Sequence, residues 1–207
     1  MNWSEFFVIA VAHLFAVASP GPDFAVVSRQ CVTGGTRLGV WTSFGVGCGV
    51  LVHVAYCILG VALLLSRSPT LFGVMKLVAA AYLFYLGVQS IKSSLLEPGF
   101  GDRTAVRVSL EPGRAFMLGF LTNGLNPKAT LFFLALFTVV IAPDTPTFMQ
   151  VIYGFYLALA TFVWFALLSN VLGQRRVREF LLRAGVWFER AMGLVLIGLA
   201  VQIAVSF

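Results

Sequence analysis

Charged side chains are scarce in this sequence: Asp, Glu, Lys and Arg make up only 11% of its 207 residues, whereas 59% of the residues are hydrophobic. A typical soluble domain is about one-quarter charged. One soluble core of this size could not bury so much apolar surface, so the expected solvent is a lipid bilayer. A second soluble domain is also excluded, because the longest polar stretch, residues 92–114, is too short to fold alone.

Cysteine and N-terminal basic residues are scarce as well. The three cysteines form neither a set of pairs nor a Cys-x-x-Cys motif, so we expect free, structural thiols. The leading residues include Glu5 but no Lys or Arg, so a cleaved signal peptide is not expected. The formal net charge is +6, but the basic residues lie in the gaps between apolar runs rather than on one face. This distribution indicates a membrane surface and not nucleic acid.

Six apolar runs are long enough to be transmembrane helices, each of which needs about 20 mostly apolar residues. The runs are apolar all round, unlike the alternating strands of a membrane barrel. We therefore predict an all-α membrane protein in which residues 1–207 form a single transmembrane transporter domain. The predicted spans cover approximately residues 5–28, 39–65, 70–91, 115–141, 147–172 and 186–206.

The basic residues are distributed unevenly among the predicted connections. Eleven Lys and Arg residues lie in or beside the first, third and fifth connections, whereas the opposite side has only Arg67 and Lys76. Under the positive-inside rule the first group is cytoplasmic, so both chain termini are predicted outside. The eleven residues are Arg29, Arg37, Lys92, Arg103, Arg107, Arg114, Arg175, Arg176, Arg178, Arg183 and Arg190.

Two predicted spans contain residues that break helices. The first span contains Ser-Pro-Gly-Pro-Asp at residues 19–23, and the fourth contains Asn-Pro-Lys at residues 126–128. Proline has no N–H and crowds the carbonyl four residues earlier. Unpaired backbone in hydrocarbon costs several kcal/mol per group, so such breaks survive only against protein or a wet cavity. The predicted breaks are at Pro20, Gly21, Pro22 and Pro127.

The two breaks fall at matching positions in the chain. Pro22 and Pro127 are 105 residues apart, as are Asp23 and Lys128. Each break lies in the first helix of a three-helix half, and because three is odd, the second half enters the membrane from the opposite side. This pattern predicts an inverted-topology repeat whose discontinuous helices meet near the bilayer midplane. The predicted half-repeats cover about residues 1–92 and 114–207.

Each break also carries a charged side chain, which is costly at membrane depth and is therefore a functional-site hypothesis. The pattern predicts a new half-helix that is capped by Asn126 and has Pro127 as its first residue. Lys128 and the free N–H groups there would suit a carboxylate, and Asp23 with the free carbonyls of the first span would suit an ammonium group. A purely structural ion pair is the alternative. The predicted substrate-binding and coupling residues are Asp23, Lys128, Asn126, Asn123, Ser19 and Tyr82.

Three further features are interpreted less specifically. His13 and His53 are the only histidines and are candidate proton relays, with interhelical hydrogen bonds as the alternative. Tyr82 is a candidate for the cavity wall, with ordinary helix packing as the alternative. Gly45 and Gly49 form a Gly-x-x-x-Gly motif that predicts close helix packing and leaves a homodimer open.

These motifs resemble the signatures of the LysE/RhtB amino-acid exporter superfamily. Residues 19–24 resemble its helix-one signature, and residues 119–128, ending Asn-Pro-Lys, resemble its helix-four signature. Residues 80–87 and 193–200 are similar to its third and last helices, so the resemblance covers essentially the whole chain. It implies a secondary exporter, driven by the proton motive force, that moves amino acids or close derivatives out of the bacterial cytoplasm through the inner membrane.

The first motif looks most like the threonine/homoserine branch of that superfamily. The chain departs from the family pattern in two ways: Thr138 stands where a proline often follows the helix-four motif, and Ala79 and Ala80 stand where glycine is common. The expected mechanism is alternating access by proton:amino-acid antiport. The expected partners are a small amino acid, protons and the lipid bilayer, with no cofactor and no metal site.

Three other classes of protein are alternatives. An exporter of metal cations or of another small metabolite within the same superfamily is the main alternative. A metal-cation exporter would need several carboxylate, thiolate or imidazole ligands at depth, whereas this chain offers one Asp with scattered His and Cys. An intramembrane enzyme would need a nucleophile–base or metal constellation that the spans lack. A scaffold without transport would have no reason to keep broken helices and buried charges.

Overall fold

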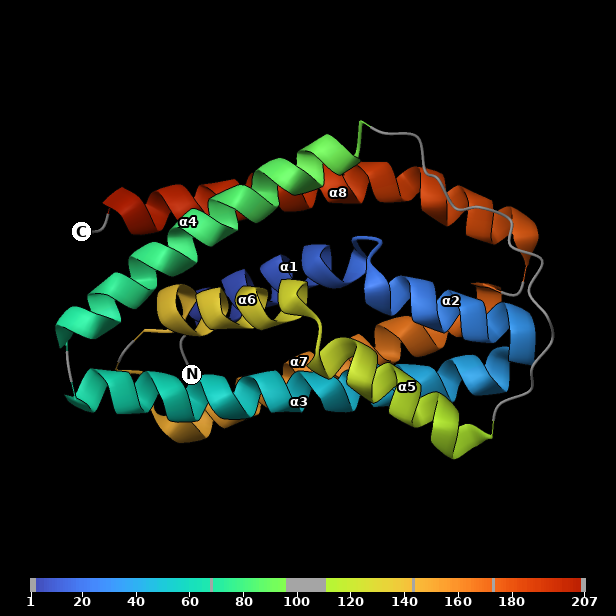
Figure 1. The fold of residues 1–207 in the computed structure, drawn as a ribbon, viewed down its shortest axis with the longest axis horizontal. Coiled ribbons are helices and arrows are strands. Elements are labelled where there is room, and N and C mark those ends of the chain that lie inside the picture. Colours follow the sequence, from blue (N-terminus) through green and yellow to red (C-terminus); the bar gives the residue numbers. More distant parts are fainter. Residues whose placement is uncertain (1–2, 68, 96–110, 143, 173, 206–207) are drawn as a thin grey trace.

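The computed structural model describes residues 3–67, 69–95, 111–142, 144–172 and 174–205, and these residues contain helices but no strand (Figure 1). Two of the basic residues assigned to the third connection, Arg103 and Arg107, lie outside the described residues. The helices are α1 (Trp3–Ala18), α2 (Pro22–Gly34), α3 (Thr36–Arg67), α4 (Pro69–Ser93), α5 (Pro112–Gly124), α6 (Pro127–Ala135), the π-helix η1 (Leu136–Val140), α7 (Thr147–Leu172) and α8 (Arg175–Val205).

Helix boundaries follow local chemistry. Helices α2, α4, α5 and α6 all begin at a proline, whose fixed φ suits the first helical turn and whose missing N–H would be unpaired there anyway. Helix α2 ends at Gly34, and the next residue, Gly35, has a φ of 82°, which glycine adopts without steric cost. The Gly35 N–H donates to the Cys31 carbonyl, 3.0 Å away, and so caps the helix.

Both predicted breaks are present in the structure. Helix α1 ends at Ala18 and α2 begins at Pro22, with a bend of 52° between them. Helix α5 ends at Gly124 and α6 begins at Pro127. The prolines produce both breaks because they cannot donate the hydrogen bond that would continue the preceding helix.

The π-helix η1 was not predicted from the sequence, which suggested an ordinary helix over residues 115–141. The Thr138 hydroxyl donates to the carbonyls of Leu134 and Ala135, at 2.8 and 3.4 Å. Threonine bonded back to the preceding turn perturbs regular helix geometry. Such π-bulges occur often at functional sites.

Only part of the predicted membrane topology is tested by length and composition. Among the described residues, two helices are long and apolar enough to cross a membrane, within Thr36–Gly60 and Thr147–Leu172, and the bent pair α1–α2 would make a third. Helices α5 and α6, with 13 and 9 residues, are each shorter than the roughly 20 residues that a span needs. The fold is therefore that of a helical membrane protein with two or three clear apolar spans, and the six-span repeat stays a prediction.

The helices form an elongated bundle (Figure 1). Helices α4 and α8 pair along one flank, and α3 packs against α5 and α7 on the opposite flank. The broken pair α1–α2 and helix α6 lie between the two flanks (Figure 1), so the breaks are in the middle of the molecule. The main core cluster is centred on side chains such as Leu157, Leu136 and Tyr153, all nearly or fully buried.

Glycines bring α3 and α5 into backbone contact. A Cβ atom at Gly45 would lie 2.0 Å from the carbonyl oxygen of Phe116, and one at Gly119 would lie 2.1 Å from that of Thr42. The predicted close packing of the Gly-x-x-x-Gly motif is confirmed, and its partner is α5 of the same chain. A homodimer would therefore need a different surface.

Candidate functional site

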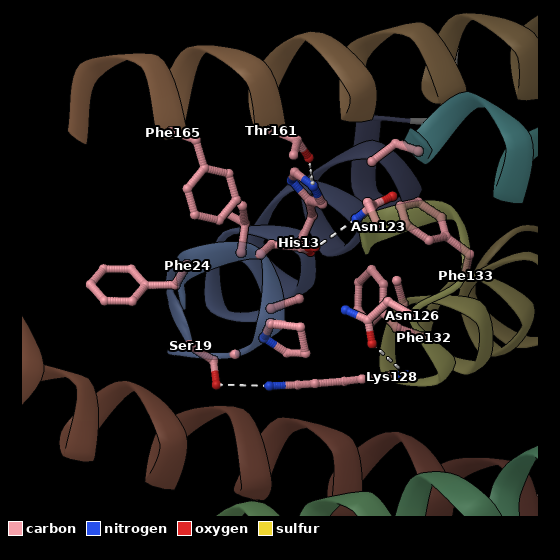
Figure 2. Close-up of a pocket in the computed structure, with 17 residues that line it drawn as sticks. His13, Ser19, Phe24, Asn123, Asn126, Lys128, Phe132, Phe133, Thr161 and Phe165 are labelled. Atoms are coloured by element: carbon pink, nitrogen blue, oxygen red, sulfur yellow. Dashed lines mark hydrogen bonds between the residues drawn. The ribbon is translucent and has the colours of Figure 1, made fainter. Parts of the chain in front are cut away.

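A cavity of about 60 Å³ lies where the two helix breaks meet (Figure 2). One water molecule needs about 10–15 Å³ on this measure, so the cavity has room for several waters or a small polar solute. Residues from α1, α2, α5, α6 and α7, with one from α3, form its wall. The polar side chains lining it are those of His13, Ser19, Asp23, Asn123, Asn126, Lys128 and Thr161.

The carboxylate of Asp23 is only partly satisfied by protein. Its Oδ2 accepts a 2.9 Å hydrogen bond from the side-chain amide of Asn123, and Lys128 and Asn126 lie within electrostatic reach. Within the described residues, Asp23 Oδ1 and Asn123 Oδ1 are buried and have no hydrogen-bond partner. A buried acceptor without a donor is costly. Asp23 lines the cavity, so its Oδ1 would favour a ligand that donates a hydrogen bond there, whereas Asn123 Oδ1 faces α3, where a Cβ atom at Gly49 would lie 2.8 Å from it.

Lys128 links the two breaks. Its ammonium Nζ, at the start of α6, donates to the hydroxyl of Ser19, 3.0 Å away in the segment between α1 and α2. Figure 2 shows this bond along one side of the cavity. The cationic group therefore faces the first break although it belongs to the second.

Asn126 caps the second half-helix, as the sequence predicted. Its Oδ1 accepts a 3.0 Å hydrogen bond from the backbone N–H of Lys128, and Pro127 occupies the first helical position. The cap satisfies one of the free N–H groups at the N-terminus of α6. It thereby anchors the turn from which the Lys128 side chain extends.

Loss of this cap is expected to lower stability measurably. Asn126→Ala removes the acceptor for the Lys128 N–H and should cost about 1 kcal/mol of folding free energy, a shift of roughly 2–4 °C in the melting temperature of a chain of this size. Thermal unfolding of the purified protein in detergent measures the shift. Asn126→Ser keeps a capping oxygen and should recover most of the loss; equal destabilisation by both variants would contradict the assigned capping role.

The histidines occupy different positions relative to the cavity. His13 lines it, and its Nε2 lies 2.9 Å from the hydroxyl of Thr161 on α7 (Figure 2). His53 is not among the lining residues; it bonds to Tyr56 and to the backbone of Asn123. Both histidines make interhelical hydrogen bonds, the alternative that the sequence left open. A role of either in proton transfer stays a prediction.

Tyr82 is not part of the cavity wall. It lies on α4 and contacts Tyr85, with ring centroids 5.8 Å apart. The structure thus brings Asp23 together with the other predicted polar residues of the breaks but leaves Tyr82 apart. The residues from the predicted site that do line the cavity are Asp23, Lys128, Asn126, Asn123, Ser19 and, among the candidate relays, His13.

Sequence reasoning missed two parts of the wall. Thr161 was a detectable signal, because it is a polar residue in the middle of an apolar run. The aromatic part of the wall carried no such signal, because the chain contains 20 phenylalanines and nothing local separates wall from core. The wall phenylalanines are Phe24, Phe132, Phe133 and Phe165.

No metal site accompanies the cavity in the part of the chain that the structure describes. Those residues include no group of three or more His, Cys, Asp or Glu side chains placed to hold a metal ion.

Comparisons with known proteins give a consistent picture. The family model described as LysE type translocator matches residues 14–206. The threonine efflux proteins of Salmonella typhi and Escherichia coli (strain K12) are each similar to this chain, 26% identical over 97% of it and 98% of their own length. The leucine efflux protein of Salmonella choleraesuis is 31% identical over 69% of this chain and 66% of its own length. No solved structure matches the chain.

Proposed function

This chain belongs to the LysE type translocator family, whose members are membrane transporters and not enzymes, and we propose that it exports small amino acids of the threonine and homoserine type from the bacterial cytoplasm in exchange for protons. The observation that carries the proposal is the meeting of Asp23 and Lys128 at one cavity. The two charges come from different helix breaks, so the cavity offers a carboxylate and an ammonium group to the two ends of a zwitterion.

Each end of the amino acid has a partner of opposite charge. The ammonium group of the substrate binds at Asp23, whose buried Oδ1 accepts its hydrogen bond. The substrate carboxylate binds Lys128 Nζ in place of the Ser19 hydroxyl, helped by the positive N-terminal end of α6. The phenylalanine wall contacts the side chain of the substrate.

Proton exchange follows from competition at the same carboxylate. When the cavity opens outward, Asp23 takes up a proton, loses its charge and releases the substrate ammonium group. When the cavity opens inward, a cytoplasmic amino acid displaces that proton. The substrate and the proton thus use one site in turn, which is the simplest form of antiport coupling.

The proposed architecture is six spans in two inverted halves. It is supported by the equivalent positions of the two breaks and by the crossing of α4 and α8. At that crossing Gly87 and Gly193, which occupy nearly equivalent positions in the two halves, meet reciprocally: a Cβ atom on either would lie 2.7 Å from the carbonyl oxygen of the other. A pseudo-twofold axis between the halves would produce such a reciprocal contact.

The proposed location is the bacterial inner membrane with both termini outside. In Figure 1 the first turn of α1 and the last turn of α8 lie at one end of the molecule. The end of α2, the start of α3 and the first turns of α8, which carry many of the basic residues, lie at the other end (Figure 1). This separation fits a cytoplasmic basic end under the positive-inside rule.

Transport by everted membrane vesicles tests the proposal directly. In such vesicles export appears as uptake, and an acidic lumen drives the exchange. We expect labelled threonine or homoserine to accumulate and a protonophore to abolish the accumulation. Leucine belongs in the panel because of the phenylalanine wall and the leucine efflux relative, and a set of divalent cations tests the metal-export alternative. Accumulation of none of the amino acids, or accumulation that survives the protonophore, would refute amino-acid antiport.

A further inference from the structure

We propose that His53 is a positioning residue, held as the neutral Nε2–H tautomer, that fixes the broken fourth span so that Asn123 presents its amide to Asp23. The proposal rests on the function proposed above insofar as Asp23 binds substrate. It differs from the sequence hypothesis that His53 relays protons, and it can be tested without any transport measurement.

His53 lies where three helices meet. It belongs to α3, its side chain is fully buried, and its ring stacks on that of Phe133 in α6, with ring centroids 5.4 Å apart and an interplanar angle of 3°. Its Nε2 lies 2.9 Å from the backbone carbonyl oxygen of Asn123 in α5. One imidazole therefore contacts both half-helices that flank the second break.

The carbonyl that His53 reaches loses its usual α-helical donor at the break. In an unbroken helix the N–H of residue 127 would donate to it, but Pro127 has no N–H. The Asn126 N–H donates to this oxygen instead, at 2.9 Å, and His53 supplies a second donor. His53 thus gives a second donor to a carbonyl that lies at the break, where unpaired backbone is costly in a membrane.

The same bond sets the tautomer of the ring. A carbonyl oxygen only accepts, so Nε2 must carry a proton. Nδ1 lies 2.7 Å from the hydroxyl of Tyr56, which donates to it when the ring is neutral. An imidazolium would turn that hydroxyl toward the Thr130 carbonyl, 3.4 Å away, where the hydrogen bond is long. It would also bury a cation to which no carboxylate of the described residues bonds, so the neutral ring is favoured.

Asn123 connects His53 to Asp23. Asn123 accepts from His53 with its backbone oxygen and donates to Asp23 Oδ2 with its side-chain amide, at 2.9 Å. Fixing the Asn123 backbone therefore fixes the amide and, with it, the orientation of the carboxylate. A proton cannot follow this route, because it ends at a backbone carbonyl, and His53 does not line the cavity.

Nitrogen NMR of the protein in lipid nanodiscs tests the tautomer. With ¹⁵N-labelled histidine and His13→Gln, His53 is the only histidine and its two ring nitrogens are assigned unambiguously. We expect one protonated and one unprotonated nitrogen, with the protonated one coupled to the ε1 and δ2 ring protons as Nε2, at every pH between about 6 and 8. A doubly protonated ring, an Nδ1–H tautomer, or an averaged signal over that range would overturn the proposal, whether or not the protein transports amino acids.

Transport kinetics of two His53 variants test the positioning role. His53→Gln can still donate from a position close to Nε2, whereas His53→Phe keeps the stack on Phe133 and removes both hydrogen bonds. We expect His53→Phe to raise KM about tenfold. The KM of His53→Gln should stay within about threefold of the wild-type value, and its transport should depend on the proton gradient as wild-type transport does. Loss of gradient-driven transport in His53→Gln, with substrate exchange at zero gradient intact, would instead establish a proton relay.

The two arms separate this proposal from the proposed function. If the wild-type protein moves no amino acid, the antiport proposal fails, and the NMR spectrum still decides whether His53 is the neutral Nε2–H donor. If the wild-type protein transports and His53→Phe has a normal KM, the positioning role fails and the antiport proposal stands.

Discussion

Asp23→Asn is expected to reduce proton-driven export about 100-fold. The substitution keeps the size of the side chain and an oxygen that can accept from Asn123, but it removes the charge that pairs with the substrate ammonium group and lies within reach of Lys128. Removing one partner of a buried charge pair costs about 2–5 kcal/mol, and about 2.7 kcal/mol corresponds to 100-fold. The initial rate of threonine or homoserine uptake by everted vesicles, per folded molecule, measures the effect.

A matched control for Asp23→Asn is available on the neighbouring helix. Glu5 is also a buried carboxylate in the α1–α2 segment, but it is absent from the cavity wall and accepts hydrogen bonds from the Thr145 hydroxyl at 3.1 and 3.2 Å. Glu5→Gln should therefore leave the rate within about twofold of wild type. Normal gradient-driven accumulation by Asp23→Asn would show that Asp23 is not the coupling site.

The alternative of a purely structural ion pair makes a different prediction for the same residue. If Asp23 and Lys128 only hold the halves together, Asp23→Asn should lower the melting temperature, and the double variant Asp23→Asn with Lys128→Met should restore it, because no unpaired charge remains buried. If the pair binds substrate, the double variant stays inactive even where its stability recovers. Melting curves and uptake rates measured on the same preparations distinguish the two roles.

Gly45→Ala is expected to destabilise the fold strongly. The added Cβ would lie 2.0 Å from the Phe116 carbonyl oxygen and 2.7 Å from the Phe120 nitrogen, so α3 and α5 would have to separate. Overpacking against side chains that can move aside costs about 1–3 kcal/mol. Helix backbone moves aside less easily, so the cost here lies at the upper end of that range. We expect a loss of about 3 kcal/mol, which lowers the melting temperature by roughly 6–12 °C for a chain of this length.

The same helix provides the control for Gly45→Ala. Among the described residues, a Cβ atom at Gly60 would have nothing within 4 Å, and alanine is the better helix former by about 1 kcal/mol at most. Gly60→Ala should therefore leave the melting temperature unchanged or raise it slightly. If Gly45→Ala melts at the wild-type temperature, the backbone contact between α3 and α5 is not as close as described. A change in transport is also expected, since α5 carries Asn123 to the cavity.

Features that depend on neighbouring residues were predictable from the sequence. The caps and breaks at Pro22, Asn126 and Pro127 follow from missing N–H groups and from a side-chain oxygen two residues away, and both breaks are present at those residues. The hydrophobic composition indicated a membrane protein, and the two charged breaks indicated a family of transporters that the comparison supports. These inferences need only local geometry and the chemistry of the solvent.

Features that depend on distant residues were not predictable to the same degree. The sequence marked His53 as a titratable group but could not show that it bonds to a backbone carbonyl 70 positions away. It suggested Tyr82 for the cavity, yet Tyr82 lies against Tyr85 outside the wall. It also left a dimer open for the glycine motif whose partner is α5 of the same chain. In each case the sequence revealed an informative residue type but not the partner that the residue contacts.

The amino-acid sequence by itself determined that this is a membrane protein and that two of its helices are broken. It also determined that the two breaks carry charges of opposite sign, Asp23 at the first and Lys128 at the second. Only the tertiary structure decided which side chains share the cavity, because Ser19 meets Lys128, and His13 meets Thr161, across 109 and 148 positions of the chain. The physical reason is that hydrogen bonds within a helix depend on adjacent turns, whereas contacts between helices depend on how closely glycine-bearing backbones approach and on the angle at which they cross.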